Sequence, residues 1–379
     1  MKKRIASAVM ACICAASLLA GCASATEDTA SKTSSKAAAS TATSAASSAA
    51  SSATASKATS AATSSTASKA ASSSTASAAS GTSAAASGYK VAMISDTSVS
   101  DGGWGASCYQ AMLDAAKEEG WETTYTDNIS VSDYVTALTD YADQGYQLIF
   151  APGNQYQDAV NQVSDDYPDI DFCLLNGTLE KDNVTSVLPD ANQIGYMAGA
   201  LAGLMSKTNQ IGFIGGMELD TTKAKLECYT KAAQKVNPSI QVQSAYAGSF
   251  SDAAKGKEIA ASMISTYNVD VMFGDASAVD TGAREAMAAS ADHYDIGQPG
   301  DLGSADDKLI ICSVVTDNAA LVKQCMEDVA NKSFGNKTIK GDLSNGCLSV
   351  GTFSSLVSSD IQKQYTDIVE QIKAGTWIQ

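Results

Sequence analysis

The chain has 379 residues, 45% of them hydrophobic and 6% aromatic, with a formal net charge of −16, and this length predicts two or three domains. Residues 1–88 carry seven basic and two acidic side chains, a net +5, which leaves −21 for the rest. Residues 89–379 are acidic enough to repel the phosphate backbone of nucleic acids and anionic lipid, which argues against nucleic-acid binding. The only histidine is His293 and the only arginines are Arg4 and Arg284. This composition argues against a His-rich metal site and a Ser/His catalytic pair, so we expect no enzyme, metal or cofactor.

Residues 1–22 have the pattern of an export signal. Three basic residues precede an apolar run from Ile5 to about Ala20, which is too short for a membrane span. The run ends in Leu-Ala-Gly followed by Cys22, which resembles a bacterial lipobox. That resemblance implies a lipid on Cys22 after cleavage of the signal peptide. We therefore expect the protein on the extracytoplasmic face of a bacterial cell membrane, held by a lipid anchor.

Residues 23–88 consist almost wholly of alanine, serine and threonine. They include no aromatic or large aliphatic side chain that could offset the entropic cost of ordering the backbone. The composition predicts a disordered tether with a root-mean-square reach of about 40–50 Å, as expected for a flexible chain of this length.

From Tyr89 onward, short apolar runs alternate with segments of helical periodicity. The first series contains four expected strands and three expected helices, and this alternation predicts an α/β lobe with a parallel doubly wound sheet. The expected strands are 90–96, 122–127, 147–151 and 171–176, with a further one at 184–188, and the expected helices are 107–119, 131–144 and 155–165.

The alternation then restarts. A helix at 191–206 carries Gly195, Gly199 and Gly203, a spacing that predicts close packing against another helix. We expect a first lobe over 89–190, to which residues 332–355 cross back, and a second over 191–331, with a C-terminal helix within 356–379 that either lobe could hold. The further expected strands are 210–215, 241–247, 269–274, 309–315 and 346–351, and the expected helices are 221–235, 252–266, 278–290, 318–331 and 356–374.

Ligands of open α/β sheets bind beyond the carboxyl ends of the strands, so a cleft between the lobes is the expected site. Its contacts should follow the strand ends at Ile94, Ala151, Leu175, Phe273 and Val315. The sequence Ala-Asp-His293-Tyr-Asp reads as a polar loop.

Several sequence blocks resemble the basic membrane protein family of solute-binding lipoproteins, whose best-understood members bind purine nucleosides for ABC transporters. These blocks are residues 101–109, 183–188, 195–205, 207–218 and 248–259, and they occur in the family's order. The resemblance covers essentially all of residues 89–379. It implies a two-lobed type I periplasmic-binding-protein fold that closes on its ligand by hinge motion.

The resemblance also implies roles for individual residues. Trp104 stands at the position of a stacking phenylalanine, Asn176 at that of an aspartate that reads the polar edge of the ligand, and Asp275 where ribose hydroxyls are held. An indole stacks well on flat rings, and a carboxylate accepts hydrogen bonds from vicinal hydroxyls. The full set of expected ligand-binding residues is Asp96, Asp101, Trp104, Gly153, Asn154, Asn176, Met217, Gly274, Asp275 and Asp317.

Three residues depart from the family pattern. Gly105 replaces an asparagine, Val315 stands where a first aspartate is expected, and Lys225 lies near the position of a second aromatic residue. The ligand is therefore expected to be nucleoside-like, and a nucleoside with another base or a different sugar-like or aromatic solute stays open.

The expected partners are this small ligand and an ABC permease, with the protein acting as a monomer. A ligand sensor that presents its closed form to a membrane receptor is the alternative. The body also holds six cysteines without a Cys-x-x-Cys pair, and the sequence leaves their pairing open: Cys108, Cys173, Cys228, Cys312, Cys325 and Cys347.

Overall fold

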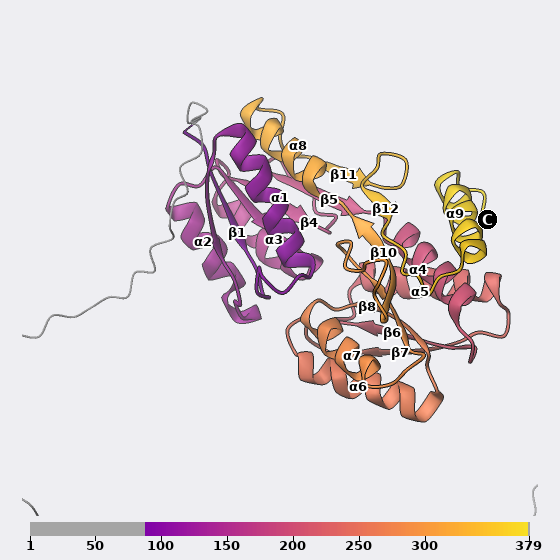
Figure 1. The fold of residues 1–379 in the computed structure, drawn as a ribbon. Helices are drawn as coiled ribbons and strands as arrows, with labels where there is room; N and C mark the ends of the chain where they lie inside the picture. The colour runs from indigo at the N-terminus through magenta and orange to yellow at the C-terminus, as the bar shows by residue number, and fades with distance from the viewer. Residues whose placement is uncertain (1–87, 378–379) are drawn as a thin grey trace, which may run out of the picture. The chain divides into compact units, whose positions relative to one another are not determined.

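The structure is a computed structural model that describes residues 88–377. The expected signal peptide, Cys22 and nearly all of the expected tether lie outside the described residues. Within the described part, the strands form two six-stranded sheets, each accompanied by its own helices (Figure 1). We refer to the two sheets and their helices as the first and second lobes. No helix in this part of the chain is long and apolar enough to cross a bilayer.

The sheet of the first lobe has the strand order β11-β5-β4-β3-β1-β2, and all neighbouring strands are parallel. Its strands are β1 (Lys90–Ile94), β2 (Glu122–Thr126), β3 (Leu148–Ala151), β4 (Asp171–Leu175), β5 (Val184–Pro189) and β11 (Lys337–Gly341). The helices of this lobe are α1 (Trp104–Glu119), α2 (Tyr134–Asp143), α3 (Gln157–Asp166) and α8 (Ala319–Ala330), with short 3-10 turns at Val131–Asp133 and Asn154–Tyr156.

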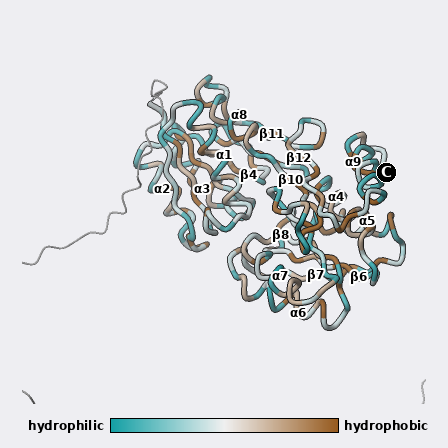
Figure 2. The backbone as a smooth tube through the Cα atoms, viewed as in Figure 1, coloured by the Kyte–Doolittle hydropathy of each residue, from teal (hydrophilic) through white to brown (hydrophobic). Residues whose placement is uncertain are grey.

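Alternate residues of each central strand bury themselves against opposite helix layers. Val91 and Met93 of β1 belong to the hydrophobic cluster that includes α1 and α8. Ala92 and Ile94 belong to the cluster that includes α2 and α3. Successive side chains of a strand point to opposite faces, so a parallel sheet with helices on both faces needs a continuous apolar run. Figure 2 shows such hydrophobic runs along the strands.

The sheet of the second lobe has the order β12-β10-β9-β8-β6-β7, in which only the pair β10–β12 is antiparallel. Its strands are β6 (Gln210–Gly215), β7 (Gln241–Tyr246), β8 (Val271–Asp275), β9 (Tyr294–Gly297), β10 (Ile310–Thr316) and β12 (Leu348–Val350). The accompanying helices are α4 (Ala191–Met205), α5 (Asp220–Val236), α6 (Ala253–Tyr267), α7 (Ala278–Ala288) and α9 (Ser359–Lys373), of which α9 packs on α4.

The glycines of α4 allow α5 to pack against it at close range. A Cβ atom on Gly199 would lie 2.1 Å from the carbonyl oxygen of Tyr229, and one on Gly195 would lie 2.4 Å from that of Lys225. No side chain fits at these distances, so the expected close helix packing is present. The contact also fixes the position of Lys225, which points from α5 toward the candidate site.

The structure differs from the sequence-based expectations in several places, and strand β11 (Lys337–Gly341) lies where no element was expected. Strand β9 follows directly on His293, in the stretch that read as a polar loop. Helix α8, which we placed in the second lobe, packs against α1 and β5 of the first. Residues 332–355 do not cross back as one segment, because β11 pairs with β5 whereas β12 pairs with β10. Periodicity indicates the type of an element, but not the sheet that it joins.

Candidate functional site

A cavity opens where segments that follow the strand ends of both lobes meet. Its empty space amounts to about 750 Å³, part of which is open solvent. The first lobe contributes residues after β1, β3 and β4 and the first residues of α1. The second contributes residues after β7, β8 and β9 together with side chains of α5 and α7. The cavity therefore lies at the carboxyl ends of parallel strands, as expected for this fold class.

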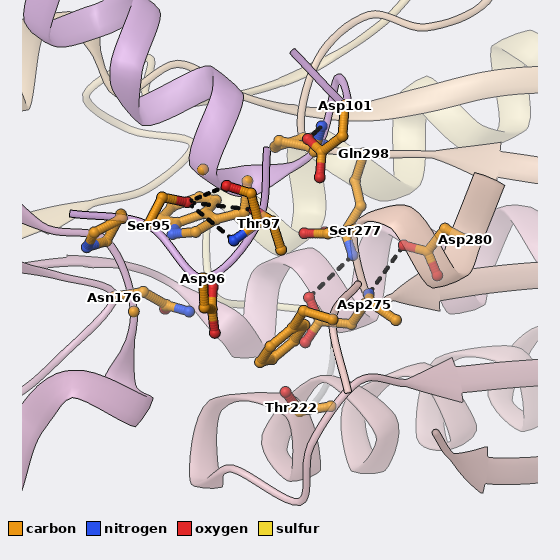
Figure 3. A pocket seen from close by; sticks show the side chains of 18 of the residues that line it. Ser95, Asp96, Thr97, Asp101, Asn176, Thr222, Asp275, Ser277, Asp280 and Gln298 are labelled. Carbon is orange, nitrogen blue, oxygen red and sulfur yellow. Dashed lines mark hydrogen bonds between the residues drawn. The ribbon is translucent and has the colours of Figure 1, made fainter. Parts of the chain in front are cut away.

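Asp96 is the best-supported carboxylate of the first-lobe wall. Its Oδ2 atom accepts hydrogen bonds from the Tyr134 hydroxyl (2.9 Å) and from Nε2 of Gln155 (3.1 Å). Its backbone N–H donates to the Tyr156 hydroxyl at 2.6 Å. Figure 3 shows its side chain directed into the cavity, near that of Asn176. The surrounding donors hold Asp96 ready to accept hydrogen bonds from a ligand.

Trp104 lines the same wall at the start of α1, and its indole Nε1 is buried without a partner among the described residues. A Cβ atom on the following Gly105 would lie 2.7 Å from Oγ of Ser95 and 2.9 Å from Oγ1 of Thr97. The two hydroxyl side chains therefore occupy the space that an asparagine at position 105 would need. This packing accounts for one of the three departures from the family pattern.

Asp101 and Gly103 bring the first-lobe wall into contact with the second lobe. The Gly103 N–H donates to Oδ1 of Asp101 at 2.7 Å, and burial raises the pKa of the Asp101 carboxyl. A Cβ atom on Gly103 would lie 2.8 Å from Cβ of Ser277 in the second lobe. Ser277 itself has a φ of 53°, a backbone conformation that residues other than glycine rarely adopt. Such strain is concentrated at ligand sites, so it supports a functional role for this contact.

An ion pair from two elements lies at the centre of the second-lobe wall. Nζ of Lys225 on α5 lies 2.6 Å from Oδ1 of Asp275 at the end of β8, and their side chains are only 6% and 16% exposed. The same carboxylate oxygen accepts a hydrogen bond from Nε2 of Gln298, which follows β9, at 3.1 Å. The Gln298 amide also donates to the Gly274 carbonyl. Near the position for which the resemblance implied an aromatic residue, this chain therefore has a buried polar unit.

Helix α7 contributes two ionisable side chains to the same wall, Asp280 and Arg284. The Ala276 N–H donates to Oδ2 of Asp280 at 2.9 Å, whereas Oδ1 of Asp280 is buried without a partner among the described residues. Burial raises the pKa of Asp280 to about 7, although the nearby Arg284 guanidinium lowers it. Arg284 donates through Nε to Oδ2 of Asp295 at 2.6 Å. Asp280 is therefore largely uncharged at slightly acidic pH, and the charge of Arg284 is balanced by Asp295.

Six of the ten expected site residues line the cavity: Asp96, Asp101, Trp104, Gly153, Asn176 and Asp275. The other four, which are Asn154, Met217, Gly274 and Asp317, are not part of its lining. Gly274 lies just behind the wall, because a Cβ atom there would sit 2.0 Å from the Asp280 carboxylate. Asp317 is exposed, and its Oδ1 atom accepts from the Ala319 N–H at the start of α8.

Sequence reasoning missed most of the second-lobe wall. It expected contacts after Val315, but the strand whose end reaches the cavity is β9, which leads to Gln298 and Pro299. It also overlooked Phe250, which packs over Gly216, and side chains on two helices. The side chains on each helix lie one turn apart, which was the available signal: Thr222 with Lys225 on α5, and Asp280 with Arg284 on α7. Of these four, only Lys225 was named beforehand, as a departure from the family pattern.

The charges around the cavity leave an acidic excess. Lys225 is paired with Asp275 and Arg284 with Asp295, so neither cation is left to balance an anionic ligand. Asp96 and Asp101 have no basic partner among the ion pairs of the described residues. The described residues also include no cluster of three or more side chains suited to a metal ion. The arrangement can bind a neutral solute through an aromatic face and several hydrogen bonds.

Two mainly parallel sheets with a cavity at their strand ends are the architecture of the periplasmic-binding-protein type. The sequence profile described as "ABC transporter substrate-binding protein PnrA-like" matches residues 89–378. The chain belongs to this family of ABC transporter substrate-binding proteins.

The chain is also similar to individual relatives and to solved structures. The chain is 30% identical over 306 residues to the ABC transporter nucleoside-binding protein BmpA of Lactococcus lactis, covering 74% of this chain and 87% of that protein. It is 26% identical to the transcriptional activator protein med of Bacillus subtilis, covering 74% and 87%. A solute-binding protein of an ABC transporter from Aeropyrum pernix has a similar fold, with a TM-score of 0.62, 22% identity and coverage of 76% and 81%.

Proposed function

We propose that this protein is a lipid-anchored solute-binding protein that captures a neutral, nucleoside-like ligand and delivers it to an ABC permease. The observation that carries the proposal is the composition of the cavity. Trp104 and Phe250 supply aromatic surface from different lobes, and Asp96 and Asp275 supply carboxylates from different lobes. A nucleoside combines a flat ring with vicinal hydroxyls, and the name of the Lactococcus relative agrees with this ligand class.

The chemistry of each wall suggests how the ligand is oriented. The Trp104 ring and the amide of Asn176 suit a heterocyclic base, whose edge carries both donors and acceptors. The unit of Lys225, Asp275 and Gln298 suits the sugar, because the ammonium and amide groups can donate to hydroxyl oxygens and the carboxylate can accept from them. Contacts from both lobes favour a closed form, which excludes water and strengthens the polar contacts.

The acidic excess of the cavity predicts discrimination between neutral and phosphorylated ligands. A 5′-phosphate is carried by the sugar, so in this orientation it would lie at the second-lobe wall, where Lys225 and Arg284 are already paired with Asp275 and Asp295 and no free cation is left to balance it. The test is a thermal-shift screen of the purified protein against nucleosides, their 5′-monophosphates, free bases, sugars and amino acids. We expect nucleosides to raise the Tm and monophosphates to raise it less. A shift from another class alone would retain a solute-binding role and reject the ligand class.

Lipid anchoring is a separate part of the proposal. Cys22 follows the predicted export signal, and a lipid there would hold the protein at the membrane. Replacing Cys22 by Ser should move the protein from the membrane fraction to the soluble fraction. If Cys22→Ser remains with the membrane after a high-salt wash, the anchor is not at this residue.

A sensory role is the second candidate, because the Bacillus subtilis relative is named as a transcriptional activator. Genetic deletion distinguishes the two roles. Loss of ligand uptake upon deletion supports transport, whereas intact uptake with a changed transcriptional response to the same ligand supports sensing.

A further inference from the structure

The first lobe contains a pair of sulfur atoms that the ligand cavity does not use. Sγ of Cys173 on β4 lies 3.4 Å from Sγ of Cys325 on α8, and both residues are fully buried. Cys108 on α1 belongs to the same hydrophobic cluster, but its sulfur lies 3.8 Å from Nδ2 of Asn318. All six cysteines among the described residues are free thiols in the structure.

The sulfur atoms of the other three cysteines contact groups that contain no sulfur. Sγ of Cys228 lies 3.4 Å from Oδ1 of Asn192, and that of Cys312 lies 3.3 Å from the Gly351 carbonyl oxygen. Cys347 packs against Gly341. Among the described residues, the structure records a sulfur–sulfur contact only between Cys173 and Cys325.

This pair connects two parts of the first lobe that are far apart in the chain. Cys173 belongs to the segment that builds the first five strands of the lobe, and Cys325 lies 152 residues later, after most of the second lobe. Helix α8 must return across that distance to pack on α1 and β5. A covalent link between such distant residues restricts the unfolded chain more than a link that closes a short loop.

We propose that Cys173 and Cys325 form a disulfide bond when the protein is exported, which fastens α8 to the sheet of the first lobe. The two thiols lose two protons and two electrons and form one S–S bond. A disulfide oxidant, such as glutathione disulfide or an extracytoplasmic thiol oxidoreductase, accepts them and leaves as two thiols. The inference rests on the extracytoplasmic location within the proposed function, because disulfides persist in oxidising compartments.

The position of the pair determines when the bond forms and what it affects. Burial raises the pKa of the Cys173 thiol well above its usual range, so the folded protein offers little reactive thiolate. Oxidation therefore takes place during folding, before α8 covers β4. Both cysteines belong to the first lobe, so the bond leaves the movement of one lobe against the other unrestricted.

The test is a disulfide map of the full chain after export in a bacterial host. Free thiols are alkylated with iodoacetamide in denaturant without reductant, and the proteolytic peptides are analysed by mass spectrometry. We expect the Cys173 peptide joined to the Cys325 peptide, with the remaining body cysteines alkylated. Alkylation of both Cys173 and Cys325 in the exported protein, or a link of either one to Cys108, overturns the proposal.

Refolding in vitro tests whether the Cys173–Cys325 bond can form, independently of whether the protein is exported. The same chain refolded with glutathione disulfide should form the bond, and Cys108→Ala should form it equally well. Cys173→Ala should leave Cys325 alkylated and create no other link. Reduction should lower the Tm of the wild type by about 5–15 °C, as expected for closure of a long loop, and leave that of Cys173→Ala unchanged. A bond that forms during refolding but not in the exported protein would refute the extracytoplasmic premise and leave the ligand class untouched.

Discussion

The two walls of the cavity are built in different ways. The first-lobe wall consists of strand-end loops and the start of one helix, where Asp96 is held by uncharged donors from Tyr134 and Gln155. The second-lobe wall adds side chains from the sides of two helices, and charge pairs hold it together, as in Lys225 with Asp275. The first wall therefore provides an aromatic surface and free acceptors, whereas the second is an internally neutralised polar network. Substitutions in the two walls should differ in their effects on stability and on binding.

The largest effect on stability should come from Lys225→Met. It leaves Asp275 buried without its cation, and breaking a buried pair in this way costs about 3–5 kcal/mol. Chemical denaturation measures the loss. As a matched control, Lys225→Met combined with Asp275→Asn removes the stranded charge and keeps an acceptor for Gln298, so it should recover part of that stability. If the double variant is no more stable than the single one, the ion pair does not have the assigned role.

The largest effect on binding should come from the first wall. Trp104→Ala removes the aromatic surface, and loss of a stacked base contact should weaken nucleoside affinity by about 10–100-fold. Titration calorimetry measures the change. Trp104→Phe should retain most of the affinity because it keeps an aromatic face. An unchanged affinity in Trp104→Ala would show that Trp104 only packs against the core.

Asp280 predicts a dependence of stability on pH that originates in the second wall. Its pKa is about 7 in the folded state and is raised above the ordinary value of 3.8, mainly by burial. The folded state therefore holds this proton to higher pH than the unfolded state, and stability falls as pH rises from about 4 to 7. Asp280→Asn removes this contribution, so the Tm of the variant relative to wild type should rise between pH 5 and pH 8. Parallel pH profiles of the two proteins would contradict the assignment.

The smallest effect should come from Asp317→Ala, which lies outside both walls. Its carboxylate accepts from the Ala319 N–H at the start of α8, so its loss should cost about 0.5–2 kcal/mol of stability. Nucleoside affinity should not change. A clear loss of affinity without a loss of stability would instead support the ligand-binding role that the sequence suggested.

The difference in construction between the two walls also explains how much of each could be predicted from the sequence. Apolar runs followed by polar loops revealed the fold and the first wall, because a buried parallel strand and the loop at its carboxyl end leave local signals. Asp96 and Asn176 follow expected strand ends, whereas Trp104 was indicated by the family resemblance, and all three line the cavity.

The second wall depends on packing that no local pattern encodes. Lys225 reaches the cavity because Gly195 and Gly199 bring α4 and α5 together. Gln298 reaches it because a strand of four residues, β9, inserts between β8 and β10. Such a short strand, directly after a polar stretch, has too little periodicity to be distinguished from a loop.

The central claim is that the cavity selects a neutral, nucleoside-like solute, and titration calorimetry with inosine and inosine 5′-monophosphate tests it most directly. The two probes share the base and ribose and differ only in the phosphate. We predict saturable binding of inosine and at least about tenfold weaker binding of the monophosphate, a difference of about 1.4 kcal/mol. Equal or tighter binding of the monophosphate would contradict the charge argument, and binding of neither probe would exclude inosine as the ligand.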